Sequence, residues 1–460
     1  MRASFAHSWR ALRHRNFQLF FFGQSISLIG TWMTRLATAW LVYRLTHSAL
    51  LLGVVSFSGQ IVSFLLGPFA AVWVERLQRR RLLVVTQAAA ALQSLSLAAL
   101  TLAHVITLEE IIALMMFQGL INAFDMPGRQ SFLVHMVEDR SDLANAIAIN
   151  SSMVNGARLI GPAIGGLIIA AFGEGWCYLI DGVSYFAVIA SLLLMKLTAL
   201  RDRTRSETTL LEELREGWNY VSGFRPIRTV LLLLALTCLM GWPYSVLLPV
   251  FAGQVLHGDA HTLGWLTAAS GVGAFSSALA LALRKSVVGL TRTLQIAVVL
   301  LGVGLILFGL SHVLWLSLAL MVVVGFGLIQ AAAVCNTIIQ SLVPDDKRAR
   351  VMGYYTMAFF GAAPFGSLLA GALAQHIGAP HTVMLTGTFC IAGAAWFTLQ
   401  LPKIRPGMRA SYRERELSAT RSAAEEARTA ARQASASITS PNTSRASPHQ
   451  RFTSMPSERR

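Results

Sequence analysis

The sequence carries few charged residues. Asp, Glu, Lys and Arg make up 13% of its 460 residues, while 54% are hydrophobic and the mean hydropathy is +0.57. An average soluble protein has about a quarter charged residues. This shortage argues against an ordinary soluble domain and favours a membrane protein whose surroundings are the lipid bilayer.

Cysteine is scarce, and familiar catalytic motifs are missing. The four cysteines lie singly in apolar stretches without the spacing of metal ligands; they are Cys177, Cys238, Cys335 and Cys390. Such residues are typical of packing rather than of disulfides or a metal site. The sequence has no Walker loop, no zinc-binding helix motif and no Gly-x-Ser-x-Gly motif. We therefore expect a protein that is not an enzyme, with no catalytic residue, metal or cofactor.

Long apolar runs are present instead. We count twelve, at residues 17–43, 50–74, 82–103, 111–124, 143–172, 177–197, 230–251, 263–283, 296–310, 314–334, 351–373 and 383–401. A helix needs about 20 residues to cross about 30 Å of hydrocarbon, and most runs approach or exceed that length. Because the runs lack the alternation of a membrane barrel, we predict an all-α membrane protein with twelve transmembrane helices.

The basic residues fall mainly in alternate connections between these runs. They cluster before the first run, after the second, fourth and sixth, and again after the eighth and tenth, whereas the other connections hold only Arg44 and the acidic residues Glu109, Glu110, Glu174 and Asp259. Positive residues favour the cytoplasmic side, so we expect both termini there, in a bacterial cytoplasmic membrane. The net charge of +16 then reflects topology, and we expect no nucleic-acid partner.

The chain divides into two similar halves. Residues 1–16 form a cytoplasmic N-terminus, 17–197 a first six-helix bundle, 198–228 a polar cytoplasmic linker and 229–402 a second bundle. Glycines 156, 161, 166 and 173 precede glycines 361, 366, 371 and 378 by a constant offset, which indicates two pseudo-symmetric bundles as in known transporters. Residues 403–460 are rich in Ser, Ala, Arg and Thr, and we expect a disordered basic cytoplasmic tail in which a short helix near residues 410–431 is the only regular structure.

Several stretches resemble the major facilitator superfamily. Residues 67–81 resemble its loop after the second helix, usually Gly-x-x-x-Asp-Arg-x-Gly-Arg-Arg, although Ala71 and Gln78 replace the glycines and Glu75 replaces the aspartate. Residues 13–53, 124–137 and 248–274 are similar to the branch of the enterobactin exporter and macrolide-efflux proteins, and the resemblance covers roughly residues 10–400. It implies the major facilitator fold and a monomeric secondary active transporter that exports a small amphipathic molecule, such as a siderophore, macrolide or drug, by alternating access and proton antiport.

The stretch GARLIGPAIGG, residues 156–166, resembles a motif of the superfamily's exporters and antiporters. Its small residues recur every four positions, which gives a helix a smooth flank for close packing; they are Ala157, Gly161 and Gly165, with Pro162 and Gly166 beside them. We predict that this flank meets the eighth helix at Ala269 and Gly273, between the two halves, and closes the outer mouth.

Polar residues inside the runs are candidates for function, because they are costly in a membrane. We predict four cavity or substrate-binding residues: Gln24, Arg35, Arg158 and Asp181. Arg35 would attract an acidic substrate group or extend to the outer surface, and Arg158 would line a polar wall or extend to the cytoplasmic surface. Asp181 would carry a proton, or accept a hydrogen bond from Ser184 or Tyr185.

The resemblance also implies a cytoplasmic gate. It consists of Glu75, Arg76, Arg79, Asp125 and Arg129. In this arrangement Arg79 pairs with Asp125, and Glu75 faces the start of the eleventh helix near residues 347–350. The alternative role for Asp125 is that of a proton site. Two other functions stay open from the sequence: a lipid or lysolipid flippase, and a membrane sensor without transport that signals through its tail.

Overall fold

The computed structural model describes residues 10–133, 136, 142–196, 210–284 and 289–439. Within these ranges, the side chains of residues 71–72, 75–76, 144, 210–214, 345–346, 349 and 410–439 lie outside the description. The described chain is helical, with short connections. Gate residues Glu75 and Arg76 are therefore placed on the backbone only.

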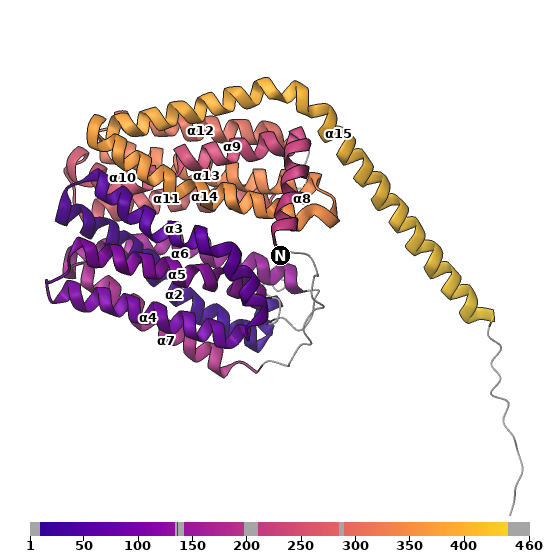
Figure 1. Cartoon of the computed structure of the whole chain (residues 1–460), viewed down its shortest axis with the longest axis horizontal. Helices are drawn as coiled ribbons and strands as arrows, with labels where there is room; N and C mark the ends of the chain where they lie inside the picture. The colour runs from indigo at the N-terminus through magenta and orange to yellow at the C-terminus, as the bar shows by residue number, and fades with distance from the viewer. Residues whose placement is uncertain (1–9, 134–135, 137–141, 197–209, 285–288, 440–460) are drawn as a thin grey trace, which may run out of the picture. The chain divides into compact units, whose positions relative to one another are not determined.

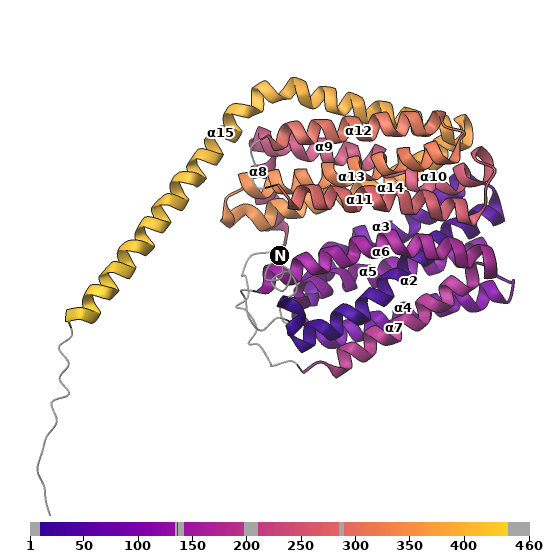
Figure 2. The same cartoon turned by 180° about the vertical axis from the view of Figure 1, so that it is seen from behind.

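Six long helices make up the first half of the chain. A short 3₁₀ helix (Arg10–Arg13) precedes α2, and the helices are α2 (Arg15–Thr46), α3 (Ala49–Arg76), α4 (Arg79–Leu102), α5 (Leu108–Leu133), α6 (Leu143–Phe172) and α7 (Glu174–Leu194). Helix α2 packs against α6 and α7, while α4 packs against α5 and α7 and α3 packs against α5. Figures 1 and 2 show these helices gathered on one side of α9 and α11–α14.

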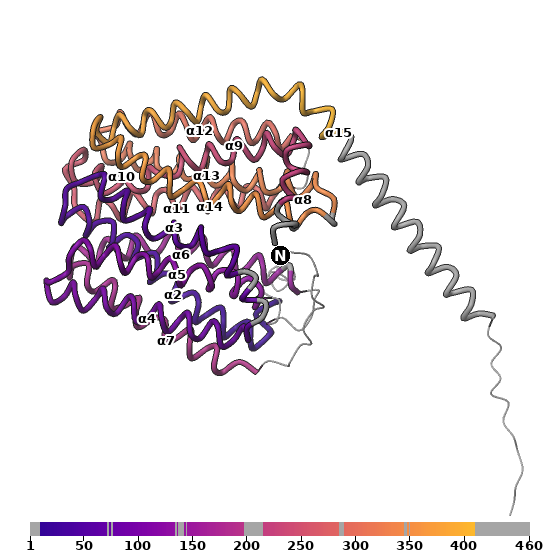
Figure 3. Tube along the Cα trace, in the orientation of Figure 1, coloured from indigo at the N-terminus to yellow at the C-terminus, as the bar shows by residue number. Residues whose placement is uncertain are grey.

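The second half follows the linker helix α8 (Leu210–Gly223). It consists of α9 (Arg225–Gly241), α10 (Tyr244–Val250), a π-helical turn (Phe251–Val255), α11 (Ala260–Ala282), α12 (Leu290–Leu310), α13 (Leu314–Leu342), α14 (Asp345–Ile377) and α15 (Ala379–Thr439). Helix α13 packs against α9, α11 and α12, and α9 packs against α14. The most extensive contacts between the halves join α6 with α11 and α3 with α14, and smaller ones join α10 with α2 and α3 and α11 with α2. The trace in Figure 3 follows this order through the chain.

Eleven segments of the described chain are long and apolar enough to cross a membrane. They are α3–α7, the continuous stretch Arg225–Val255 and α11–α15, wholly or in their apolar parts. Helix α2 is not among them, since Arg35, Arg44 and several hydroxyl and amide residues interrupt its apolar sequence. Its 32 residues nevertheless extend about 48 Å, more than the hydrocarbon thickness of about 30 Å.

The repeated glycines occupy corresponding positions in the two halves. Gly173 ends α6 with φ of 90°, and Gly378 ends α14 with φ of 81°, a left-handed conformation that favours glycine. A side chain on Gly161 would meet α2, and one on Gly366 would meet α9. The offset in the sequence therefore corresponds to equivalent packing roles of α6 and α14.

The C-terminal segment differs from its prediction. The chain divides into two compact units, residues 1–405 and 406–460. Only a short helix near residues 410–431 was expected in the tail, and the structure instead continues α15 as helix to Thr439. Alanine, arginine and glutamate, which are frequent in this segment, have high helix propensity. Residues 440–460 lie outside the described residues.

Candidate functional site

The α6–α11 contact is a close approach of two backbones. A Cβ atom added to Gly166 would lie 2.9 Å from the carbonyl oxygen of Ala260 and 3.0 Å from Cα of Gly264. A Cβ atom on Gly264 would in turn lie 2.9 Å from the carbonyl oxygen of Pro162. No side chain larger than hydrogen fits at either position unless the helices separate, as expected for small-residue packing in a membrane.

The α3–α14 contact repeats this arrangement. A Cβ atom on Gly53 would lie 2.7 Å from the carbonyl oxygen of Ser367, and one on Gly371 would lie 2.7 Å from that of Ala49. We call the α6–α11 and α3–α14 contacts the two seams. Gly371 corresponds to Gly166 in the glycine repeat, so equivalent residues close both seams.

Both backbone contacts lie at the same end of the helices. Gly166 is near the C-terminus of α6 and Gly53 near the N-terminus of α3. Two further contacts lie at this end: Arg44 in the last turn of α2 pairs with Glu174 of α7 at 3.0 Å, and the hydroxyl of Ser48, the N-cap of α3, donates to Oε1 of Gln375 on α14 at 3.2 Å. In the predicted topology this is the outer end.

The seams are open toward the opposite end. Gly67 on α3, Gly156 on α6 and Gly353 on α14 would each accept a Cβ atom with no neighbouring atom within 4 Å. The same helices that touch through backbone atoms at one end therefore leave space at the other. The two seams are thus tightly closed near Gly53 and Gly166 and not at the positions of Gly67 and Gly156.

The partners of the small-residue flank differ in part from the prediction. Gly166 and the Pro162 carbonyl face α11, but Gly161 and Gly165 pack against Trp32 and Met33 on α2, inside the first half. Ala157 is buried on the same helix. Gly161 and Gly166 are five residues apart, so they point to different sides of α6.

On α11 the close contact with α6 is made at residues other than those predicted. Gly273 faces the backbone of Val322 on α13, and Ala269 is half-buried. The seam uses Gly264 and Gly271 instead, since a Cβ atom on Gly271 would lie 2.9 Å from Cα of Leu159. These two glycines are seven residues apart and share one helical face, which Gly273 does not.

Two arginines meet aromatic rings between the halves. The guanidinium carbon of Arg35 lies 4.8 Å from the centroid of the Trp32 ring, and that of Arg158 lies 5.5 Å from the same centroid. Arg158 also lies 5.4 Å from the ring of Trp242, at the end of α9, and beside Tyr244 of α10. We call Trp32, Arg35, Arg158, Trp242 and Tyr244 the arginine–tryptophan cluster. It joins α2 and α6 of the first half to α9 and α10 of the second.

Arg35 faces the interior of this arrangement. Its side chain is exposed although its neighbours Thr34 and Leu36 are buried in the middle of α2. The ring that it covers also contacts Arg158, and Cβ of the same tryptophan faces Gly161 of α6. An accessible charge at this depth, between helices of both halves, is expected in a water-filled cavity. Gln24 is 2% exposed and does not share this accessibility.

Asp181 lies apart from the cluster, in the interior of the first half. Its carboxylate is 1% exposed, and Oδ2 accepts hydrogen bonds from Thr34 of α2 at 2.9 Å and Ser94 of α4 at 3.2 Å. Oδ1 has no hydrogen-bond partner. Ser184 donates to the backbone carbonyl of Asp181 rather than to its carboxylate. The sequence did not indicate Thr34 or Ser94 as partners.

Asp125 is the centre of a second buried polar group. It is 4% exposed, pairs with Arg129 one turn along α5, and accepts hydrogen bonds from Thr86 at 2.9 Å and Gln87 at 2.8 Å on α4. Arg79 begins α4. These contacts tie α4 to α5 within the first half. The gate pairing between Arg79 and Asp125 stays a prediction.

Removal of this carboxylate is expected to destabilise the protein. In Asp125→Ala, Arg129 loses its partner and two donors on α4 lose their acceptor; breaking a buried pair costs about 3–5 kcal/mol, and partial exposure of Arg129 favours the lower end. Thermal unfolding of the purified protein in detergent would measure the loss. Glu216→Ala is the control, because exposed pairs such as Glu216–Arg350 contribute at most about 1 kcal/mol. Equal losses in both variants would contradict this interpretation.

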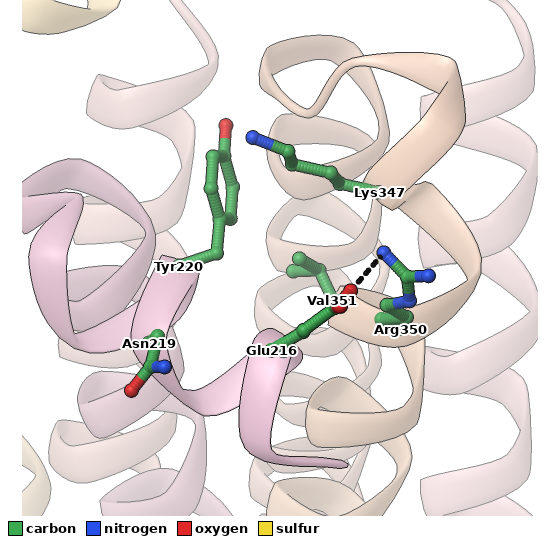
Figure 4. Close-up of a pocket in the computed structure, with 7 residues that line it drawn as sticks. Glu216, Asn219, Tyr220, Lys347, Arg350 and Val351 are labelled. Carbon is green, nitrogen blue, oxygen red and sulfur yellow. Dashed lines mark ion pairs between the residues drawn. The ribbon is translucent and has the colours of Figure 1, made fainter. Parts of the chain in front are cut away.

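The linker helix α8 packs against the start of α14. Glu216 pairs with Arg350 at 2.7 Å, and the Lys347 ammonium lies 4.8 Å from the ring centroid of Tyr220 (Figure 4). Together with Asn219 and Val351 these residues line a hollow of about 300 Å³. Lys347 and Arg350 were expected to face Glu75, whose side chain lies outside the description. The structure gives them partners on α8, whose polar sequence did not indicate this contact.

The helices lie in two halves, the seams between the halves are closed at one end, and an accessible charged cluster lies between the halves. These features define a transporter of the major facilitator type. The chain belongs to the transmembrane secretion effector family of this superfamily, whose model matches residues 6–423. It is 26% identical to the staphyloferrin A transporter of Staphylococcus aureus over 391 residues, 84% of this chain and 97% of the relative. It is 27% identical to the multidrug efflux pump Tap of Mycolicibacterium fortuitum over 383 residues, 82% of this chain and 93% of the relative.

More distant proteins share the fold. Macrolide efflux protein A of Streptococcus pyogenes is 20% identical over 391 residues, 83% of this chain and 96% of the relative. The crystal structure of the nucleoside transporter NupG matches with a TM-score of 0.64 at 14% identity, over 85% of this chain and 99% of that one. An inward-facing bacterial homologue of the human lysosomal transporter Spinster matches with a TM-score of 0.65 at 14% identity, over 86% and 98%.

Proposed function

We propose that this protein is a monomeric secondary active transporter that exports a small amphipathic molecule across the bacterial cytoplasmic membrane by alternating access. The observation that carries the proposal is the asymmetry of the seams, which meet through backbone atoms at Gly166 and Gly53 but are open at Gly156 and Gly67. Two halves that meet tightly at one end, with an accessible cluster between them at mid-depth, fit this cycle.

The topology proposed for this function has twelve spans. Helix α2 is the twelfth, because it is long enough to cross the membrane and packs between α6 and α7. Its polar residues then face helices rather than lipid, as Thr34 does toward Asp181. Both termini lie in the cytoplasm, and α2–α7 and α9–α15 form two six-helix bundles joined by residues 198–228.

Proton antiport is the driving force that we propose. Asp181 is the candidate carrier, because its carboxylate is buried and one of its oxygens lacks a hydrogen-bond donor. The substrates printed for the relatives, a siderophore, multiple drugs and macrolides, suggest the cargo classes to test first.

Everted membrane vesicles would test the proposal. Vesicles that contain the protein should accumulate at least one member of a panel of siderophores, macrolides and dyes when a proton gradient is imposed, and an uncoupler should abolish the accumulation. Vesicles without the protein provide the control. No accumulation of any member would refute the exporter, while movement of fluorescent lysolipids alone would favour the flippase.

Deletion of residues 410–460 should leave export unchanged if the tail is not a signalling element.

A further inference from the structure

Arg35 and Arg158 lack an acidic partner in the described part of the chain. Each contacts the ring of Trp32, and Arg158 also contacts Trp242, but no ion pair to a described carboxylate involves either arginine. Two positive charges beside the same ring repel each other, and a cation–π contact contributes less than a paired carboxylate in such a site. By contrast, Arg44 on the same helix α2 has Glu174 as its partner.

The nearby carboxylate of Asp181 does not fill this role. Asp181 lies near enough to attract Arg35 electrostatically, but the two groups form no direct ion pair in the described part of the chain. Oδ2 of Asp181 accepts hydrogen bonds from Thr34 and Ser94, and its Oδ1 lies beside the backbone of Gly30. Because neither guanidinium group is held in an ion pair with a described carboxylate, the cluster can bind an anionic group that enters between the halves.

We propose that the arginine–tryptophan cluster binds a carboxylate group on a planar, aromatic part of the cargo. A guanidinium group matches a carboxylate through two parallel hydrogen bonds, and Trp32 and Trp242 supply flat apolar faces beside the two guanidinium groups. The inference rests on the proposed exporter function and specifies its substrate class as aromatic organic acids.

Arg158 gives the site a second property. It projects from α6 in the first half and contacts Trp242 and Tyr244 of the second half, and Tyr244 is held by Ser270 of α11 at 2.6 Å. A carboxylate bound to Arg158 competes with these contacts across the halves. Binding of the acid is thus coupled to the contact that must change during alternating access.

Calorimetric titration of the purified full-length protein with naphthoate would test the site, with naphthamide as the neutral analogue. Naphthoate should bind more tightly than naphthamide. Arg35→Gln and Arg158→Gln should each weaken naphthoate binding at least about tenfold, the loss expected for a charge-assisted hydrogen bond, and leave naphthamide binding unchanged. Arg44→Gln should bind naphthoate like the wild type, and Arg35→Lys and Arg158→Lys should retain part of the affinity.

Several results would overturn the inference. They are equal affinity for naphthoate and naphthamide, no binding of naphthoate, or wild-type affinity for naphthoate in both glutamine variants. If the glutamine variants do not fold, the affinity of the lysine variants for naphthoate is compared with that of the wild type instead. Vesicles that export neutral dyes while naphthoate fails to bind would refute this site and leave the exporter intact. Binding that depends on both arginines in a protein that exports nothing would refute the exporter and leave the site intact.

Discussion

Replacement of Gly166 by leucine should reduce export by about fivefold or more. The added Cβ atom would lie 2.9 Å from a backbone oxygen and 3.0 Å from a backbone carbon of α11, and neither atom can rotate away as a flexible side chain would. Overpacking of this kind costs typically about 1–3 kcal/mol. A cost of this size, borne only by the state with the closed outer mouth, shifts the balance between two states by about 5–150-fold.

The measurement for this variant has two parts. Export from everted vesicles gives the rate, and labelling of Ser48→Cys by a membrane-impermeant thiol reagent reports the second seam, where Ser48 contacts Gln375. If the halves move as rigid bodies, the leucine on α6 should increase labelling at this distant position. Gly223→Leu is the control, because Gly223 ends α8 outside both seams and its Cβ atom would meet no neighbour within 4 Å. Wild-type export by Gly166→Leu, or an equal loss in Gly223→Leu, would contradict the role of the seam.

Asp181→Asn should abolish accumulation against a gradient while downhill exchange of the cargo continues. Asparagine keeps the shape of the side chain and its acceptor toward Thr34, but it cannot take up and release a proton at this position. A charged carboxylate inside the membrane is costly in free energy, and binding of a proton removes that charge. The protonated form can therefore serve as the proton-carrying state of the transport cycle. Proton-driven accumulation in vesicles, compared with counterflow without a gradient, would separate coupling from binding.

A buried but paired carboxylate provides the control for this experiment. Glu174 is 4% exposed and pairs with Arg44, so Glu174→Gln should retain proton-driven accumulation even if the protein is less stable. Undiminished accumulation by Asp181→Asn would assign the proton to another group. Equal loss in both variants would indicate a structural effect rather than a role in coupling.

The sequence predicted the helices well because membrane spans are marked by length and composition alone. The runs at 50–74, 143–172 and 314–334 lie within or nearly within α3, α6 and α13. The glycine offset also predicted the equivalent turns at Gly173 and Gly378, since a left-handed residue at a helix end favours glycine in both halves.

The sequence could not assign faces to these helices. Helices that are apolar on all sides lack the polar stripe that orients a helix in a soluble protein. Gly161 and Gly166 therefore seemed to share one flank, although the first packs on α2 and the second on α11. The contacts of Trp32 and Trp242 with Arg158 were not predicted either, because they bring together three segments that are distant in the sequence.

The seams have a consequence for how such a protein can change. The seams are closed by backbone contacts, glycine Cα atoms against carbonyl oxygens, at Gly53, Gly166, Gly264 and Gly371. Their closure therefore depends little on the identity of the neighbouring side chains. The cluster between the halves, in contrast, consists of side chains from α2, α6 and the α9–α10 junction. If this cluster binds the cargo as proposed, substitutions there can change which molecule is carried while the backbone contacts of the seams stay the same. One scaffold could then acquire new substrates in small evolutionary steps, with Arg158 as the residue that still links the cargo to the contact between the halves.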